Sequence, residues 1–183
     1  MNYVAEFEKL GFNLELNENA MTAKCLKPSK RAILGFTVKF NYYFRTVERM
    51  EEFLKNFIEG EKRAIELKEA RKLETKKRKQ ALVDNVKVGD LFVSSWGFEQ
   101  TNIDFYEVVE KKGATVTVRE IAAARVEGSE YSHGMADEVV PVKGKYIGEP
   151  MKKRLNAYGF NVNSFASARK TEEGKKQYRS WYA

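Results

Sequence analysis

The clearest alternation of hydrophobic and polar positions lies in the middle of the chain, where it predicts short β-strands. An apolar run at residues 91–93 follows the pair Gly89-Asp90. Glycine tolerates a positive φ and aspartate binds nearby backbone amides, so this pair predicts a turn into a strand. Residues 94–96 continue the strand, and Gly97 breaks it.

A return strand and further strands are predicted after this break. An aromatic run at residues 105–110 resumes the strand pattern, and a Lys112-Gly113 hairpin signal precedes alternation over residues 114–121. A last apolar run contains Pro141, a residue that favours the edge of a sheet. Roughly four or five short strands are too few for a sandwich. They predict a small SH3-like antiparallel β-barrel over residues 85–143.

Residues 1–60 are predicted to form a β-β-β-α module. Hydrophobic and polar positions alternate in three runs that turn-forming residues separate. In the third run the hydrophobic side chains on one face are Phe36, Val38, Phe40 and Tyr42. Residues 3–10 carry hydrophobic positions at helical spacing and fit either a short helix or a strand.

A long helix is predicted after Thr46, whose hydroxyl can accept a hydrogen bond from a backbone amide of the first turn. Hydrophobic residues follow at a spacing of 3.6 as far as Ile58, so this part can pack on the preceding sheet. Over residues 61–84 the hydrophobic stripe thins and charged residues dominate. We therefore expect a basic connecting helix there. Its thinning stripe from Ile65 to Leu73 could also support a homodimer.

Residues 144–183 lack strong periodicity and are predicted to form a basic, aromatic C-terminal arm. Clusters of lysine and arginine alternate there with tyrosine, phenylalanine and tryptophan. Such an arm either docks its aromatic side chains on the protein or stacks them on single-stranded nucleic acid. The predicted fold class is α+β, with an N-terminal β-rich segment, a long basic helix and a small barrel with a basic tail.

The composition of the chain limits the kinds of partner and compartment that we expect for it. The chain has 33 Lys+Arg against 26 Asp+Glu, a net charge of +7. This balance favours nucleic acid as partner, and it fits a basic protein without such a partner as well. The single cysteine, Cys25, permits no intrachain disulfide and is predicted to be a buried apolar side chain. Without a recognisable signal peptide or long apolar run, we expect a cytoplasmic protein that does not bind membranes.

Three basic stretches, two on the helix and one in the arm, are candidate phosphate-binding segments. Phosphate contacts of this kind are sensitive to salt and independent of base sequence. Charge runs are also common on the solvated faces of exposed helices, so a purely structural role stays open. The candidate residues are Arg71, Lys72, Lys76, Lys77, Arg78, Lys79, Lys152, Lys153 and Arg154.

The loop after the first barrel strand is the candidate site for specific recognition. The ring of Trp96 beside the amides of Gln100 and Asn102 could stack a base and read its edge. The same polar residues could instead fasten one long barrel loop by bonding its backbone. Both interpretations stay open.

The sequence offers little for catalysis. His133 is the only histidine, and it lies near Ser132 and Asp137. Neither a second histidine nor a nearby cysteine completes a metal site or a catalytic triad. No nucleotide-binding loop or nucleophile elbow is found.

Four carboxylates could in principle gather around Mg²⁺. Their spacing alternates across strand faces and a loop, which argues against a single cluster of Asp90, Glu99, Asp104 and Glu107. We expect no cofactor and no enzymatic activity. The alternative is a hydrolase or nuclease built on Asp90, Asp104 and His133.

The stretch KVGDLFVSSWGFEQTNIDFYEVVEKKGATVTVREI resembles a segment of small uncharacterised proteins of bacteriophages and plasmids. The similar features are the Val-Gly-Asp opening, Ser-Ser-Trp-Gly before an aromatic residue, Gln-Thr-Asn, and the acidic-Phe-Tyr return. The aromatic FNYYF run before the basic helix and the final Ser-Trp-Tyr are similar too. The resemblance covers about residues 36–142. It implies a mobile-element origin and an accessory role.

These observations predict a non-enzymatic nucleic-acid-binding accessory protein of a bacteriophage or mobile element. The alternative is a protein–protein inhibitor of a host defence complex, of the anti-restriction or anti-CRISPR type. Inhibitors that mimic DNA are mostly acidic, so a basic chain would instead bind an acidic face of the host nucleoprotein complex or its nucleic acid.

Overall fold

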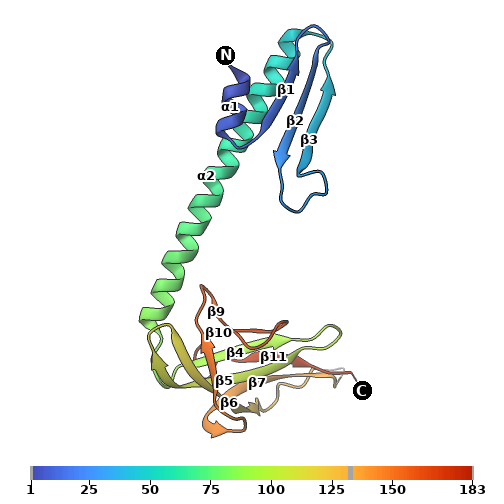
Figure 1. Ribbon diagram of the computed structural model, residues 1–183. Coiled ribbons are helices and arrows are strands. Elements are labelled where there is room, and N and C mark those ends of the chain that lie inside the picture. Colours follow the sequence, from blue (N-terminus) through green and yellow to red (C-terminus); the bar gives the residue numbers. More distant parts are fainter. Residues whose placement is uncertain (1, 132–133, 183) are drawn as a thin grey trace. The chain divides into compact units, whose positions relative to one another are not determined.

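The computed structural model describes residues 2–131 and 134–182, and the chain divides into two compact units, Met1–Lys72 and Leu73–Ala183. The first unit contains a three-stranded antiparallel sheet, and the second contains a curled antiparallel half-barrel sheet (Figure 1). A long helix lies between the two sheets in sequence. The predicted α+β class and the order of its parts are therefore confirmed.

The first unit packs helices against one face of its sheet, whose strand order is β1-β2-β3. The predicted β-β-β arrangement is confirmed, and the segment that fitted a helix or a strand is a helix. The elements are α1 (Tyr3–Lys9), β1 (Asn13–Asn17), β2 (Thr22–Pro28), β3 (Phe36–Tyr43) and the start of α2 (Val47–Asn85).

Aromatic rings fill the core of the first unit. Phe7 of α1 stacks on Phe57 of α2 with ring centroids 5.2 Å apart, and Phe40 of β3 meets Phe57 edge-on at 5.0 Å. Aromatic pairs in these geometries add to the free energy gained by burying their surface. This packing encloses Cys25 of β2, which is fully buried.

Cys25 reports on this core, because burial raises the pKa of its thiol to about 11 and the charge of Glu61 adds to the shift. Only the thiolate reacts readily, so we expect native Cys25 to react with a thiol reagent at pH 8 more than roughly 100-fold slower than the denatured chain. Equal rates with and without denaturant would show that the core around Cys25 does not form.

Both ends of α2 are capped. The amide of Arg49 donates to the hydroxyl of Thr46 at 3.3 Å, which confirms the predicted N-cap. At the C-terminal end the ammonium of Lys111 donates to the carbonyls of Val83 and Val86, at 2.6 and 2.8 Å. The Val83 carbonyl belongs to the last turn, where carbonyls lack a partner within the helix, and Val86 directly follows the helix end; a cation there also complements the negative end of the helix dipole. None of the helices that the structure describes is both long and apolar enough to cross a membrane.

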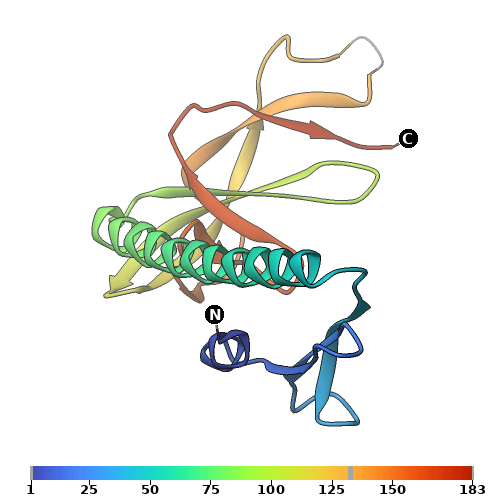
Figure 2. The same cartoon turned by 90° about the horizontal axis from the view of Figure 1, so that it is seen from above.

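The second unit is an eight-stranded antiparallel sheet that curls into a half-barrel (Figures 1 and 2). The order is β11-β7-β6-β5-β4-β10-β9, and β8 pairs with β6 beside this path. The strands are β4 (Leu91–Trp96), β5 (Asn102–Lys112), β6 (Thr115–Arg125), β7 (Ala136–Tyr146), β8 (Met151–Arg154), β9 (Gly159–Asn161), β10 (Ser167–Thr171) and β11 (Gln177–Ser180).

Hydrophobic side chains cover both faces of this sheet, as expected for a strongly curled structure. On one face Phe92, Tyr106 and Phe160 pack with the last turn of α2. On the other face Phe105 and Ile121 form a smaller cluster. The packed sheet therefore supports the polar side chains that it presents to solvent.

The predicted C-terminal arm over residues 144–183 is wrong in one respect, because its described part is not a tail. Strands β8 to β11 all join the sheet, and β10 lies directly beside β4. Each of these strands is only three to five residues long. Two or three alternations are too few to stand out from the sequence, and their pairing partners lie far away along the chain.

Two local predictions also need correction. Asn102 begins β5, so the predicted long polar loop shrinks to residues 97–101. Pro141 lies in β7, which is flanked by β6 and β11 and so is no edge strand as a whole, although β11 pairs only with residues 136–139 and ends before Pro141. A register shift between β6 and β7 beside Ala123 accommodates it, since bulges tolerate a residue without an amide proton.

Candidate nucleic-acid interface

Strand β8 divides the predicted basic triplet between two faces of the sheet. Lys152 pairs with Thr117 of β6 and Arg154 pairs with Thr115, and both basic side chains are exposed. Lys153 is opposite Val116, and its ammonium donates to the carbonyl of Val162 at 2.6 Å. Lys152 and Arg154 are thus available to a ligand, whereas Lys153 holds the chain after β9 in place.

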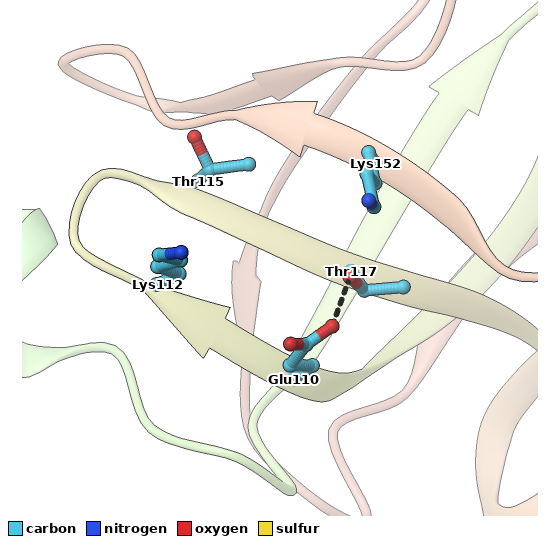
Figure 3. A pocket seen from close by; sticks show the side chains of 5 residues that line it. All are labelled: Glu110, Lys112, Thr115, Thr117 and Lys152. Atoms are coloured by element: carbon cyan, nitrogen blue, oxygen red, sulfur yellow. Dashed lines mark hydrogen bonds between the residues drawn. The ribbon is translucent and has the colours of Figure 1, made fainter.

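An open depression of about 450 Å³ lies where β8 meets the β5–β6 hairpin (Figure 3). We call it the lysine–threonine groove, and its lining residues are Glu110, Lys112, Thr115, Thr117 and Lys152. The hydroxyl of Thr117 donates to Glu110 at 3.0 Å. Neither lysine makes an ion pair within the described residues.

The groove combines positive charge with hydroxyl groups. Lysine, arginine and threonine are among the side chains that contact phosphate oxygens in protein–nucleic acid complexes. The groove has one carboxylate, that of Glu110, against three positively charged side chains: Lys112, Lys152 and the adjoining Arg154. Lys112 and the two threonines were absent from the predicted site. Their alternation along β6 was visible, but nothing in the sequence showed that β8 pairs with them.

The basic residues of α2 differ in what they contact. Arg78 forms an ion pair with Glu74 at 2.9 Å, and its guanidinium lies 5.2 Å from the centre of the Tyr158 ring. Lys79 is half-buried, whereas Lys76 and Lys77 are exposed. Arg71 and Lys72, which end the first unit, are exposed as well. None of these residues lines the groove.

The predicted recognition residues are largely bonded to one another. The indole nitrogen of Trp96 donates to Asp104 at 2.6 Å, and the amide of Gln100 donates to Asn102 at 3.1 Å. Gly97 has a φ of +125°, and a Cβ there would meet the carbonyl oxygen of Gln100 at 2.1 Å. The polar side chains are thus bonded to each other and not to the loop backbone as one interpretation expected, while Trp96 stays 38% exposed.

Strand β11 holds the same turn from the other side. Thr101 and Ser180 form an isolated antiparallel bridge, and the amide of Thr101 also lies 3.0 Å from the hydroxyl of Ser180. Trp181 follows this bridge. It lines a shallow hollow of about 310 Å³ with Asn102, Arg179 and Ser180.

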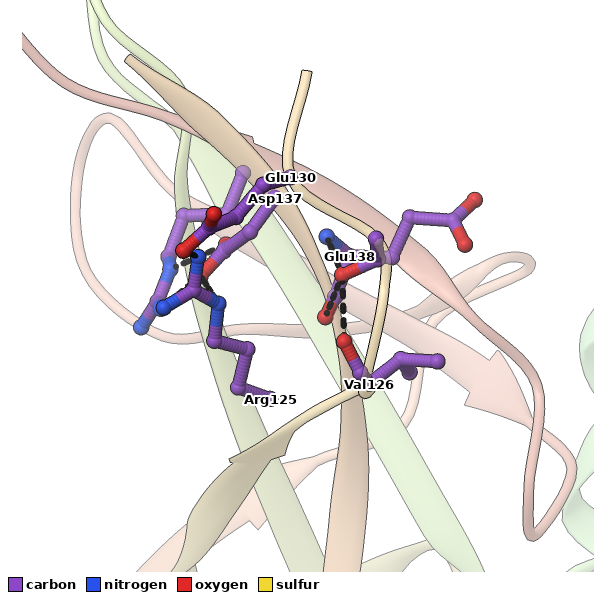
Figure 4. A network of polar contacts seen from close by, with 7 residues as sticks. Arg125, Val126, Glu130, Asp137 and Glu138 are labelled. Carbon is purple, nitrogen blue, oxygen red and sulfur yellow. Dashed lines mark hydrogen bonds and ion pairs between the residues drawn. The ribbon is translucent and has the colours of Figure 1, made fainter. Parts of the chain in front are cut away.

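An ion-pair network centred on the buried carboxylate of Asp137 anchors β11 to β7 (Figure 4). The carboxylate of Asp137 accepts two hydrogen bonds from Arg179, at 3.0 and 2.7 Å, and Arg125 approaches it to 3.5 Å. Arg125 also pairs with Glu130. Asp137 is almost completely buried, so these contacts, not solvent, stabilise its charge.

We expect Asp137→Asn to lower the free energy of unfolding of the second unit by about 3 kcal/mol, because it leaves two arginines without their buried partner. Glu138→Gln is the matched control. Glu138 is partly exposed and pairs with Lys176 at 3.1 Å, so its loss should cost less than about 1 kcal/mol. Urea denaturation followed by tryptophan fluorescence measures both, and equal effects would contradict the role given to Asp137.

The carboxylates considered for catalysis do not converge. Asp90 binds Lys170 at 2.6 Å and the amide of Lys87 at 2.7 Å, whereas Glu107 accepts from the amide of Gly144. Within the described residues no group of three or more His, Cys, Asp or Glu could hold a metal ion. His133 and Ser132 lie outside the described residues.

No protein-family model, curated protein or solved structure matches this chain.

Proposed function

We propose that this chain is a non-enzymatic nucleic-acid-binding accessory protein of a bacteriophage or mobile element. The lysine–threonine groove carries the proposal. It places Lys112 and Lys152 beside two threonine hydroxyls on a packed sheet, with Arg154 adjoining and no competing ion pair of either lysine in the part of the chain that is described.

In this proposal the half-barrel is the binding module, the role that the sequence prediction gives to a small SH3-like barrel. It supports short strands whose polar side chains face a polyanion. Backbone phosphates would enter the groove and displace counterions, which makes the affinity strongly dependent on salt. The exposed Lys76 and Lys77 of α2 would add a second, weaker contact.

Binding of fluorescently labelled 20-nucleotide single- and double-stranded DNA and RNA tests the proposal, with anisotropy measured at about 50 mM salt. Proteins with such contacts bind nonspecifically with Kd values on the order of 10⁻⁴ to 10⁻⁶ M or tighter. We expect at least one of the four polymers to bind in this range. Absence of binding to all four would overturn the proposal.

The second candidate function is inhibition of a host defence complex through a protein surface. Ile33 and Leu34, at the turn between β2 and β3, are the observation that favours it, because both are strongly exposed. Adjacent exposed apolar side chains are a feature of protein contact sites. Pull-down from nuclease-treated host lysate, with Ile33→Ser/Leu34→Ser as control, separates the two functions. A partner retained by the wild type and lost by the variant would favour inhibition.

A homodimer through α2 also remains a proposal. Ile65, Leu67 and Leu73 are exposed on this helix. Sedimentation equilibrium tests it, since a monomer at about 100 μM would argue against self-association.

A further inference from the structure

The face of the half-barrel that carries the larger core changes character towards one end of β4 and β5. Strand pairing sets Phe92 opposite Tyr106, Ser94 opposite Asp104 and Trp96 opposite Asn102, and paired residues project from the same face. Tyr106 is in turn opposite Glu120 of β6. One sheet face therefore passes from a hydrophobic core to a polar set. We call this set the Asp104 cluster: Ser94, Trp96, Asn102, Asp104 and Glu120.

Two carboxylates lie close together in this cluster. Asp104 and Glu120 are diagonal neighbours on adjacent strands, a placement that lets side chains interact. Burial raises the pKa of the Glu120 carboxyl, and the charge of Asp104 raises it further. Burial also raises the pKa of the Tyr106 hydroxyl, with both carboxylates adding to the shift. Partial burial of like charges destabilises a fold, so this arrangement calls for a function.

An independent observation concerns Ser94. Its side chain is completely buried, and its hydroxyl has no hydrogen-bond partner within the described residues. Buried polar atoms without a partner are rare and destabilising. The hydroxyl projects from the same face as Asp104, directly across the strand pair. A ligand polar group at the cluster would provide its missing partner.

Aromatic side chains border the cluster. The indole of Trp96 is 38% exposed, and Phe165, 72% exposed, meets it edge-on with ring centroids 6.0 Å apart. The hydrogen bond from Trp96 to Asp104 fixes the orientation of the indole ring. A planar ligand can therefore stack on an aromatic surface while its edge reaches the carboxylates.

We infer that the Asp104 cluster is a subsite for an unstacked nucleobase that carries an exocyclic amino group. A carboxyl oxygen of Asp104 accepts from the amino group, and the partly buried Glu120 meets the neighbouring ring atoms. Trp96 stacks on the face of the base. Adenine, cytosine and guanine carry such an amino group, whereas thymine and uracil do not. Reading of a base edge requires a single strand.

This inference rests on the proposed function, and it specifies single-stranded nucleic acid as the ligand. The test uses labelled oligothymidylate of ten nucleotides and three versions in which one central thymine is replaced by adenine, cytosine or guanine. We expect at least one substituted oligonucleotide to bind the wild-type protein about tenfold more tightly than oligothymidylate. Asp104→Ala/Glu120→Ala should remove this preference, because alanine offers no acceptor to the amino group.

A second measurement follows Trp96 itself. The chain has two tryptophans, so Trp181→Phe leaves Trp96 as the only one. Its fluorescence should be quenched when the preferred oligonucleotide binds, because base stacking quenches indole emission.

The failures of the two proposals are distinguishable. No binding of any oligonucleotide would refute the proposed function and this inference together. Equal affinity for all four oligonucleotides, or a preference that survives in the double variant, would refute this inference alone. Quenching of Trp96 by an arginine-rich peptide but by no oligonucleotide would also refute it and would assign the cluster to a cationic peptide.

Discussion

Replacement of Gly159 by alanine is expected to destabilise the second unit by at least about 3 kcal/mol. Gly159 has a φ of +155°, and a Cβ there would lie 1.8 Å from the carbonyl oxygen of Ala168. That carbonyl belongs to β10, which pairs with β9 and β4, so neither backbone can move without disturbing the sheet. Severe overlap with a buried backbone belongs to the mutations with the largest effects on stability.

Chemical denaturation monitored by tryptophan fluorescence measures this effect, because Trp96 and Trp181 both belong to the second unit. Gly113→Ala is the matched control. Its φ of +59° is also positive, but no atom lies within 4 Å of the added Cβ. Its cost should be only about 1 kcal/mol, from backbone conformation alone. If both variants lose the same amount, the close approach of β9 to β10 is incorrect.

Reversal of charge in the groove is the second change with a large expected effect. Lys152→Glu/Arg154→Glu replaces two cations that adjoin the threonine hydroxyls by two anions. We expect the Kd for the preferred nucleic acid at about 50 mM salt to rise by at least roughly 100-fold, since both attraction and counterion release are lost. Both side chains are exposed, so the fold should be unchanged, which circular dichroism checks.

Lys175→Glu is the control for this pair. Lys175 is an exposed lysine between β10 and β11 and does not line the groove. It alters the net charge in the same direction at a different place. A similar loss of affinity per reversed charge in both variants would mean that binding follows net charge, and that the groove is not the site.

The outline of the fold was accessible from the sequence because its long elements carry strong local signals. Thr46 marked the start of α2, and alternating residues marked β1 to β3 and the centre of the half-barrel. The C-terminal cap of α2 could not be predicted from the sequence in the same way. This cap comes from Lys111 and Lys170, which lie on strands distant from the helix end in sequence.

Only part of the candidate site could be predicted from the sequence, for the same reason. Lys152 and Arg154 were visible as charges, but their face of the sheet depends on the pairing of β8 with β6. The polar neighbours of Asp104 predict a loop at this position. In the structure it is a strand residue whose side chain meets Trp96. The predicted site differs from the observed one because short strands and long-range strand pairing leave little trace in a local sequence pattern.

The salt dependence of binding tests the central claim most directly. For single strands the slope of log K against log salt concentration is about −0.7 for each phosphate contact. Lys152→Ala/Arg154→Ala should therefore make the wild-type slope shallower by about 1.4, as expected for two lost contacts. Identical slopes for the wild type and the variant would contradict phosphate binding in the lysine–threonine groove.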